Sequence, residues 1–207
     1  NTLKNIEIVD QNPIGRSSRS NPATYSKAYD GIRKIFAQEG EKIDSQIKPS
    51  DFSFNVDGGR CDDCLGEGVK KIEMQFMADL FLECSACKGK RFKKNILEVK
   101  HNGKNIHDVL ELTIEQAIQF FSSASTILKK LKPMFDVGLG YLRLGQSSST
   151  LSGGEAQRLK LASYLIEEKS PQNNSLYIFD EPTSGLHNKD IAYFMSSISR
   201  LIDMGNS

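Results

Sequence analysis

Four cysteines are the residues of this sequence whose spacing most directly indicates chemistry. They form two Cys-x-x-Cys pairs, Cys61 with Cys64 and Cys84 with Cys87, and the 207-residue chain has no other cysteine. A two-residue gap lets both thiolates of one turn reach a single ion at about 2.3 Å, and four thiolates fill a tetrahedral site with no position left for water. We therefore predict a structural Zn²⁺ site rather than a catalytic one.

Three other interpretations use the same cysteines: two disulfides, one redox-active pair, or an iron–sulfur cluster. A redox motif ordinarily comes as a single pair, and a disulfide framework spreads its cysteines along the chain. Each pair here is followed two residues later by a glycine, Gly66 or Gly89, which suits the tight backbone of a zinc knuckle. The pattern favours zinc, and we expect residues 58–95 to depend on the metal for folding.

A second group of residues could bind an anion. In Leu151–Arg158, Ser152 can cap a helix with Glu155 at the third helical position, and Gly153 and Gly154 leave backbone N–H groups uncovered. These N–H groups lie at the positive end of the helix dipole, which predicts an anion site. A capped helix start is common by itself, so its meaning depends on the next motif.

That next motif is an acidic pair after a short apolar run. Leu176–Phe179 predicts a strand buried on both faces, and the strand delivers Asp180 and Glu181 at its carboxyl end. Open α/β sheets bind their ligands at this end of the strands. Asp180 can hold Mg²⁺ and Glu181 can orient or deprotonate an attacking water, although a turn or a helix cap could also use such a pair.

The elements that must position these groups follow from local patterns, and they indicate an α/β protein. A capping box of Thr113 and Gln116 opens one helix, and Pro133 should end another. Glu39–Ser50 is a polar linker. The predicted elements are a strand over 6–10, an extended loop over 12–21, helices over 23–38, from 113 and over 125–132, a strand through 52–56 and short strands within 72–82.

Charge offers one local candidate for contact with nucleic acid. The chain has 27 basic and 26 acidic residues, so its net charge of +1 gives no global attraction to DNA. The run 88–94 contains basic residues and no acid, and Lys88, Lys90 and Arg91 are the candidates for contact with phosphates. A solvated surface explains such a run equally well. No apolar stretch approaches the roughly 20 residues of a membrane-spanning helix, so we expect no membrane contact.

The order of these motifs resembles that of a known superfamily. The Ser-Gly-Gly helix start, the Asp-Glu strand and the following Pro-Thr-Ser-Gly-Leu look like the signature motif, Walker B strand and D-loop of ABC-type ATPases. Within that superfamily the chain resembles the UvrA family over essentially its whole length, most closely the C-terminal nucleotide-binding half. The likeness rests on residues 9–25, Val-Asp-Gln-x-Pro-Ile-Gly-Arg-Ser-x-Arg-Ser-Asn-Pro-Ala-Thr-Tyr, on the two cysteine pairs, on Val-Gly-Leu-Gly-Tyr at 137–141 and on Leu-Ser-Gly-Gly-Glu-Ala-Gln-Arg at 151–158.

The resemblance implies a fold and a set of roles. The fold would be part of an ABC-ATPase core of the P-loop NTPase type, residues 1–44 and 146–207, with a helical signature domain inserted at 45–145 and a zinc module at 57–95. Gln11 would be the Q-loop glutamine that senses Mg²⁺ and the γ-phosphate of ATP. Ser152, Gly153 and Gly154 would contact that phosphate on a nucleotide held by the opposing half. Asp180 and Glu181 would serve Mg²⁺ and water, and Cys61, Cys64, Cys84 and Cys87 would bind zinc.

The resemblance also implies a biological role, that of the cytoplasmic ATPase subunit that recognises DNA damage in bacterial nucleotide excision repair. Its partners would be damaged double-stranded DNA, the helicase-like B component of the excinuclease and a second copy of the full-length protein, and the family's zinc module favours the DNA interpretation of the basic run. The sequence contains no Gly-x-x-x-x-Gly-Lys-Ser/Thr loop, so we expect these residues alone to be inactive. His187 is interpreted as a loop residue, not as a catalytic switch.

Two alternatives remain at this point. One is a UvrA-like paralogue that serves drug self-resistance, which the sequence does not separate from a repair protein. The other is a zinc-stapled interaction module of the kind found in J-domain co-chaperones, because residues 61–68 match Cys-x-x-Cys-x-Gly-x-Gly.

Overall fold

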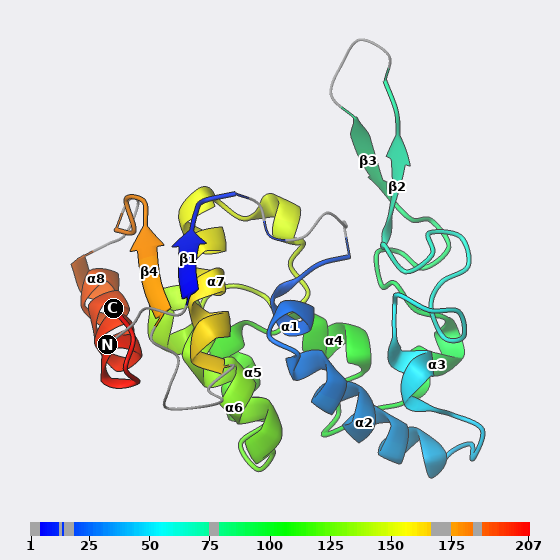
Figure 1. The fold of residues 1–207 in the computed structure, drawn as a ribbon. Helices are drawn as coiled ribbons and strands as arrows, with labels where there is room; N and C mark the ends of the chain where they lie inside the picture. The colour runs from blue at the N-terminus through cyan, green and yellow to red at the C-terminus, as the bar shows by residue number, and fades with distance from the viewer. Residues whose placement is uncertain (1–4, 13, 15–18, 75–78, 167–174, 184–187) are drawn as a thin grey trace. The chain divides into compact units, whose positions relative to one another are not determined.

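The computed structural model describes residues 5–12, 14, 19–74, 79–166, 175–183 and 188–207. The chain forms two compact units, the first from residues 1–28 and 112–207 and the second from residues 29–111 (Figure 1). These two units are not the two parts that the resemblance implies, an ATPase core and a signature domain inserted at 45–145. That division stays a prediction.

The first unit contains a parallel pair of strands, β1 (Asn5–Val9) and β4 (Ser175–Phe179), in which Val9 is the partner of Phe179. The two strands therefore end at the same edge, and the chain segments that follow them, from Asp10 and from Asp180, leave from that edge. Figure 1 shows the two strands side by side, with helix α8 (Asn188–Asp203) next to β4. This arrangement brings together two motifs that lie far apart in the sequence.

One face of this sheet is covered by aromatic contacts. Tyr177 packs on Tyr164 of α7 (Gly153–Ile166) with ring centroids 4.9 Å apart, and Phe179 packs on Phe194 of α8 at 6.1 Å. On the other face Ile178 is 46% exposed, and Ile6 and Ile8 of β1 are more exposed still, at 64% and 67%. The prediction that Leu176–Phe179 is buried on both faces is therefore wrong, because no described element covers the second face.

Other helices of the first unit follow local signals closely, with one exception. The Thr113 capping box is confirmed, since its hydroxyl accepts from Gln116 N and opens α5 (Ile114–Phe120). Asn21 caps the short α1 (Pro22–Tyr25) in the same way. Helix α6 (Ser125–Met134) does not stop before Pro133, contrary to the prediction; the proline gives up one backbone hydrogen bond, and the helix ends one residue after it. A π-type turn, Phe135–Leu139, follows directly, and a 3-10 turn, Ser148–Thr150, precedes α7.

The second unit is built around α2 (Ala28–Glu41), whose first residue belongs to the first unit. The predicted single helix over 23–38 is broken between α1 and α2, where Lys27 adopts a φ of +61°. The other elements of the unit are a 3-10 turn (Pro49–Phe52), the antiparallel strands β2 (Val69–Ile72) and β3 (Leu80–Glu83), and helices α3 (Lys94–Glu98) and α4 (Ile106–Glu111).

The predicted strand through residues 52–56 is wrong. Phe52 and Phe54 are both fully buried; Phe52 ends a 3-10 turn and the chain bends at residues 54–56, so the segment forms no strand. The Tyr29 hydroxyl donates to the Phe52 carbonyl at 2.7 Å, and the ring of Phe36 packs on that of Phe52. Burial of these rings against α2 replaces the strand pairing that the alternating pattern predicted.

Candidate nucleotide and metal sites

Gln11 and Asp180 meet at the carboxyl edge of β1 and β4. The Gln11 side-chain amide donates to the backbone carbonyl of Asp180 at 3.3 Å. The Asp180 and Glu181 side chains are exposed. Residues predicted from two separate motifs, Gln11 and the Asp180–Glu181 pair, thus lie at the edge where α/β sheets bind ligands. Their roles toward a nucleotide stay predictions.

The tip of helix α7 adjoins the same edge. The predicted capping box is formed, because Ser152 N donates to Glu155 Oε2 at 2.7 Å and Glu155 N donates to Ser152 Oγ at 3.3 Å. A Cβ placed on Gly153 would lie 2.8 Å from Gln11 Oε1 and 3.0 Å from Gln11 Cβ. Any side chain at position 153 would therefore displace the Gln11 side chain.

Two residues of α7 that had no predicted role hold this edge together. Gln157 donates to the carbonyl oxygens of Val9 at 2.7 Å and Asp180 at 2.9 Å, so one buried amide ties the ends of both strands. Lys160 donates to the carbonyls of Asp10 and Asn12 and to the Asp10 carboxylate. The hydrogen bond from Lys160 holds the pKa of Asp10 below its ordinary value. The spacing of three residues, which puts both side chains on one helix face, was the available signal.

Glu181 has an unusual backbone conformation. Its φ is +43°, in the left-handed region that residues other than glycine rarely adopt. Such conformations cost of order 1–3 kcal/mol and cluster at functional sites. The backbone therefore leaves the strand conformation at Glu181, directly after Asp180.

The four cysteines come together in the second unit. All four are buried, and their sulfur atoms lie within 4.8 Å of one another. The Sγ atoms of Cys61 and Cys84 are 4.0 Å apart, and those of Cys64 and Cys87 are 3.7 Å apart. Tetrahedral bonds of about 2.3 Å place neighbouring sulfurs roughly 3.8 Å apart. The spacing of the cluster is therefore close to what a tetrahedral metal site requires.

Backbone hydrogen bonds join the two knuckles reciprocally. Cys61 N donates to the Arg91 carbonyl at 2.8 Å, and Cys84 N donates to the Gly68 carbonyl at 2.9 Å. As predicted, Gly66 and Gly89 have positive φ, +85° and +72°. A Cβ on Gly66 would lie 2.4 Å from the Phe54 carbonyl oxygen, so the first knuckle also requires glycine for space.

Local hydrogen bonds also bias the charge state of the cluster. The backbone N–H groups of Cys87 and Ala86 lower the pKa of the Cys84 thiol, whereas burial raises that of Cys64. A thiol with a lowered pKa loses its proton readily, as a metal ligand must.

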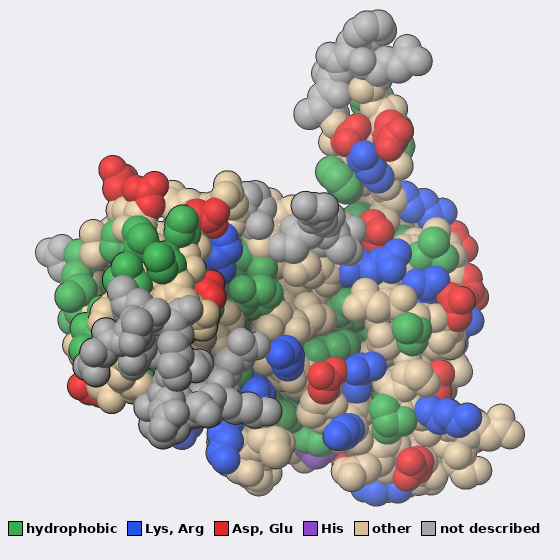
Figure 2. All heavy atoms as spheres, in the orientation of Figure 1, with side chains coloured by type: hydrophobic (Ala, Val, Ile, Leu, Met, Phe, Trp, Pro, Cys, Tyr) green, Lys and Arg blue, Asp and Glu red, His purple; other side chains and the backbone are tan. Residues whose placement is uncertain are grey.

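The basic run has two different kinds of member. Lys88 and Lys90 are exposed, and neither makes an ion pair within the described part of the chain. The guanidinium of Arg91 instead lies over the ring of Phe54, 5.6 Å from its centroid, and burial lowers its pKa. Lys93 pairs with Asp62 at 3.0 Å. Figure 2 shows Lys and Arg intermingled with Asp and Glu over the visible face, so any phosphate contact there would be local.

Comparisons with known proteins show which proteins this chain resembles. No protein-family model matches the chain. UvrABC system protein A of Clostridium tetani is 52% identical over 205 residues, which are 99% of this chain and 22% of that protein. The Thermus thermophilus protein of the same name is 54% identical over 205 residues, again 99% of this chain and 21% of the relative. The crystal structure of UvrA2 from Deinococcus radiodurans matches with a TM-score of 0.90 and 44% identity, over 99% of this chain and 25% of that one.

This chain belongs to the UvrA family. It spans about a fifth of the length of the relatives it matches. The mixed helix and sheet architecture predicted from the resemblance is confirmed by the match to UvrA2. The relatives favour neither the resistance paralogue nor the chaperone-type module.

Some predictions on this UvrA-family chain lie outside the described residues. The predicted D-loop can be followed only to Thr183, and the interpretation of His187 is untested. The same holds for Pro13 and residues 15–18 after Gln11. Among the described helices, none is both long enough and apolar enough to span a membrane.

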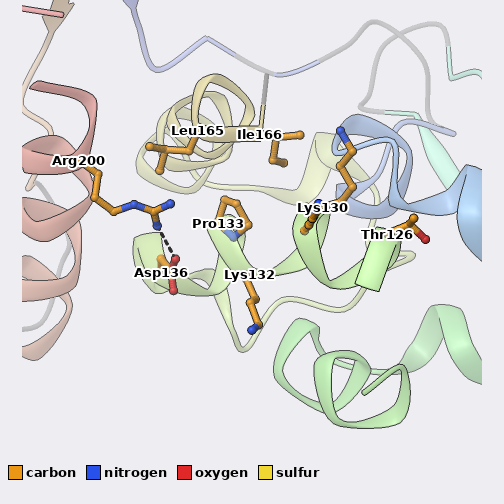
Figure 3. Close-up of a pocket in the computed structure, with 9 residues that line it drawn as sticks. Thr126, Lys130, Lys132, Pro133, Asp136, Leu165, Ile166 and Arg200 are labelled. Carbon is orange, nitrogen blue, oxygen red and sulfur yellow. Dashed lines mark hydrogen bonds and ion pairs between the residues drawn. The ribbon is translucent and has the colours of Figure 1, made fainter. Parts of the chain in front are cut away.

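A cavity of about 660 Å³ lies at the opposite end of α7 from Gly153. Its wall includes Leu165 and Ile166 from the last turn of α7, with residues of α6 and α8 (Figure 3). The cations around it do not converge, because Lys130 and Lys132 point in different directions. Arg200 is already paired with Asp136 at 2.8 Å. The cavity is therefore separate from the candidate nucleotide site.

Proposed function

We propose that this chain is part of the ATPase subunit that recognises DNA damage in bacterial nucleotide excision repair. The observation that carries the proposal is the meeting of Gln11 and Asp180 at the carboxyl edge of the sheet, against the glycine tip of α7. Membership of the UvrA family supports the biological setting, a cytoplasmic repair system that includes the helicase-like B component of the excinuclease.

The strand-end acids would divide the chemistry of ATP hydrolysis between them. Asp180 is exposed and offers carboxylate oxygens, which are the ligands that Mg²⁺ prefers. Mg²⁺, when bound, neutralises the charge that develops on the phosphates. Glu181 would orient the attacking water and accept its proton. The amide of Gln11 already contacts the Asp180 backbone. Gln11 would therefore couple the binding of Mg²⁺ and the γ-phosphate to the conformation of the segment that follows it.

The signature residues would serve a nucleotide held by the opposing half. Ser152 is exposed at the start of α7, where Gly153 and Gly154 leave the first N–H groups of the helix open to an anion. We propose that these three residues contact the γ-phosphate of ATP and that the full-length protein works as a homodimer. Because the sequence has no P-loop, hydrolysis requires polypeptide beyond these residues.

We further propose that the cysteine cluster holds Zn²⁺. The donor set is four thiolates, a set typical of structural zinc, and sulfur separations of 3.7 and 4.0 Å suit its bond lengths. Cys61, Cys64, Cys84 and Cys87 would fill every coordination position, which leaves the ion a structural role.

Damaged double-stranded DNA is the proposed partner of the second unit. Lys88 and Lys90 carry exposed charges that could neutralise phosphates. Arg91, the third residue of the predicted set, packs over Phe54 and would contribute less directly to phosphate contact.

The substitution Glu181→Gln tests the ATPase proposal. It should be made in the full-length protein, with the other nucleotide site already inactivated, so that only the site served by Glu181 is measured. Loss of the general base should lower turnover by about 10²–10⁴-fold and leave nucleotide binding intact. Glu98→Gln, at an exposed position of α3, is the matched control. Turnover that survives in Glu181→Gln would refute the role assigned to this carboxylate.

A further inference from the structure

Tyr141 contacts the signature motif from outside it. Its hydroxyl donates to Glu155 Oε1 at 2.7 Å, although its ring is 57% exposed. The residue ends the Val-Gly-Leu-Gly-Tyr segment at 137–141, to which the proposed function gives no chemical role.

Glu155 links this tyrosine to the phosphate-binding tip. Its Oε1 atom accepts from Tyr141 and its Oε2 atom accepts from Ser152 N, so both carboxylate oxygens are in use. Burial by itself would raise the pKa of Glu155, but these donors outweigh it and hold the pKa below the ordinary value. Glu155 is thus an ionised bridge between Tyr141 and Ser152.

The bridge determines what the Ser152 hydroxyl can do. Ser152 Oγ accepts a hydrogen bond from Glu155 N at 3.3 Å. A hydroxyl that accepts in this way still has its own hydrogen to donate. The exposed Ser152 can therefore present that hydrogen to a phosphate oxygen, provided that the capping box holds its backbone in place.

Tyr141 is itself fixed by the start of α5. Glu115 N donates to the Gly140 carbonyl at 3.0 Å, and Ile114 N donates to the Leu142 carbonyl at 2.9 Å. A Cβ on Gly140 would come 2.8 Å from the Phe135 ring, so the turn before Tyr141 is closely packed. The tyrosine hydroxyl therefore reaches Glu155 from a rigid support.

We propose that Tyr141 is a positioning residue for ATP hydrolysis, which acts through Glu155 to aim Ser152 at the γ-phosphate. This inference rests on the proposed function and deepens it, because it adds a residue outside the signature motif that controls the motif's geometry. A residue that only stabilised the surface would affect all nucleotides alike. A residue that aims Ser152 affects only the steps that depend on the γ-phosphate.

The test is Tyr141→Phe in the full-length protein, which removes one hydroxyl and keeps the ring. We expect kcat for ATP to fall about tenfold or more, as for loss of one hydrogen bond to a charged group, with ADP affinity unchanged and the protein still folded at the assay temperature. Tyr193→Phe is the matched control. Tyr193 is 56% exposed, and its hydroxyl makes no hydrogen bond within the described residues.

A double-mutant cycle with Glu155→Gln separates coupling from coincidence. If Tyr141 acts through Glu155, then adding Tyr141→Phe to Glu155→Gln should cause little further loss of kcat. Additive losses, equal losses of ADP and ATP binding, or a Tyr141→Phe protein as active as Tyr193→Phe would each overturn the inference. If Glu181→Gln abolishes turnover while Tyr141→Phe has no effect, only the positioning role fails. Turnover that does not depend on Glu181 means that the proposed function fails.

Discussion

Removal of the metal should melt the β2–β3 hairpin and leave the helices of the second unit folded. The hairpin strands have four residues each, and all of their side chains except that of Val69 are exposed. A two-stranded hairpin without a buried face is at best marginally stable in water. A thiolate zinc site, by contrast, contributes an apparent free energy of about 10–16 kcal/mol near neutral pH. The order of the hairpin therefore depends on the knuckles that anchor both of its strands.

The helical part of the unit has its own source of stability. Ile32 and Phe36 of α2 and Ile106 and Leu110 of α4 are fully buried, and burial of each such side chain contributes about 1.5–3 kcal/mol. None of these residues binds the metal. Chelation should therefore act locally, and it should not unfold the unit as a whole.

Hydrogen exchange can measure this difference in the full-length protein. Peptides over residues 69–72 and 80–83 should lose protection when a chelator is added, while peptides over α2 and α4 should keep theirs. Cys84→Ser should show the same exchange pattern without chelator and should bind one metal ion fewer per chain, whereas Ser85→Ala in the same turn should match the wild type. Hairpin protection that is indifferent to the metal, or an unchanged metal content in Cys84→Ser, would refute the reasoning.

Three further predictions follow from single contacts. Gly153→Ala should leave the melting temperature nearly unchanged, because position 153 is the first residue of α7 and the nearest atom belongs to a flexible side chain. Its methyl group should displace Gln11 and lower ATP turnover at least tenfold; unchanged turnover would contradict the 2.8 Å contact. The double substitution Lys88→Glu with Lys90→Glu should weaken binding to damaged duplex and reduce the slope of log K against log[salt] by about 2. The charge-matched pair Lys129→Glu with Lys130→Glu on α6 should not. An unchanged slope would exclude the basic run at 88–94 from DNA binding. The Glu155 carboxyl should titrate below its ordinary range in NMR spectra of the wild type and shift upward in Tyr141→Phe. Its contribution to the free energy of unfolding is present above the ordinary pKa of about 4.3 and is lost as pH falls through the lowered value, and equal pKa values in both proteins would contradict the hydrogen bond.

Features controlled by neighbouring residues could be predicted from the sequence. The cysteine spacing, the glycines of the knuckles and the capping boxes at Thr113 and Ser152 each depend on a few adjacent positions, and the structure contains all of them. The wrong predictions concern packing over longer distances. Phe52 and Phe54 alternate as in a strand, yet both are buried against residues of α2. Tertiary burial outweighs the local pattern there.

The candidate nucleotide site shows the same division. Gln11, Asp180 and the Ser-Gly-Gly tip could be found because their side chains or glycines form recognisable motifs. The spacing of Gln157 and Lys160 places both on one helix face but does not identify their partners. Apart from the Asp10 carboxylate, those partners are main-chain carbonyls of Val9, Asp10, Asn12 and Asp180, which have no side-chain signature. Such residues become visible only when both strand ends are placed beside one helix.

The backbone at Glu181 supports a functional reason for that residue. A glycine would adopt a φ of +43° without the steric penalty that an L side chain meets there, so stability alone favours glycine at this position. Glutamate instead accepts a cost of order 1–3 kcal/mol. Its side chain is exposed, so packing does not repay that cost. A carboxylate held against a conformational penalty, one residue after Asp180 at the carboxyl edge of the sheet, supports the role of general base that we propose for Glu181.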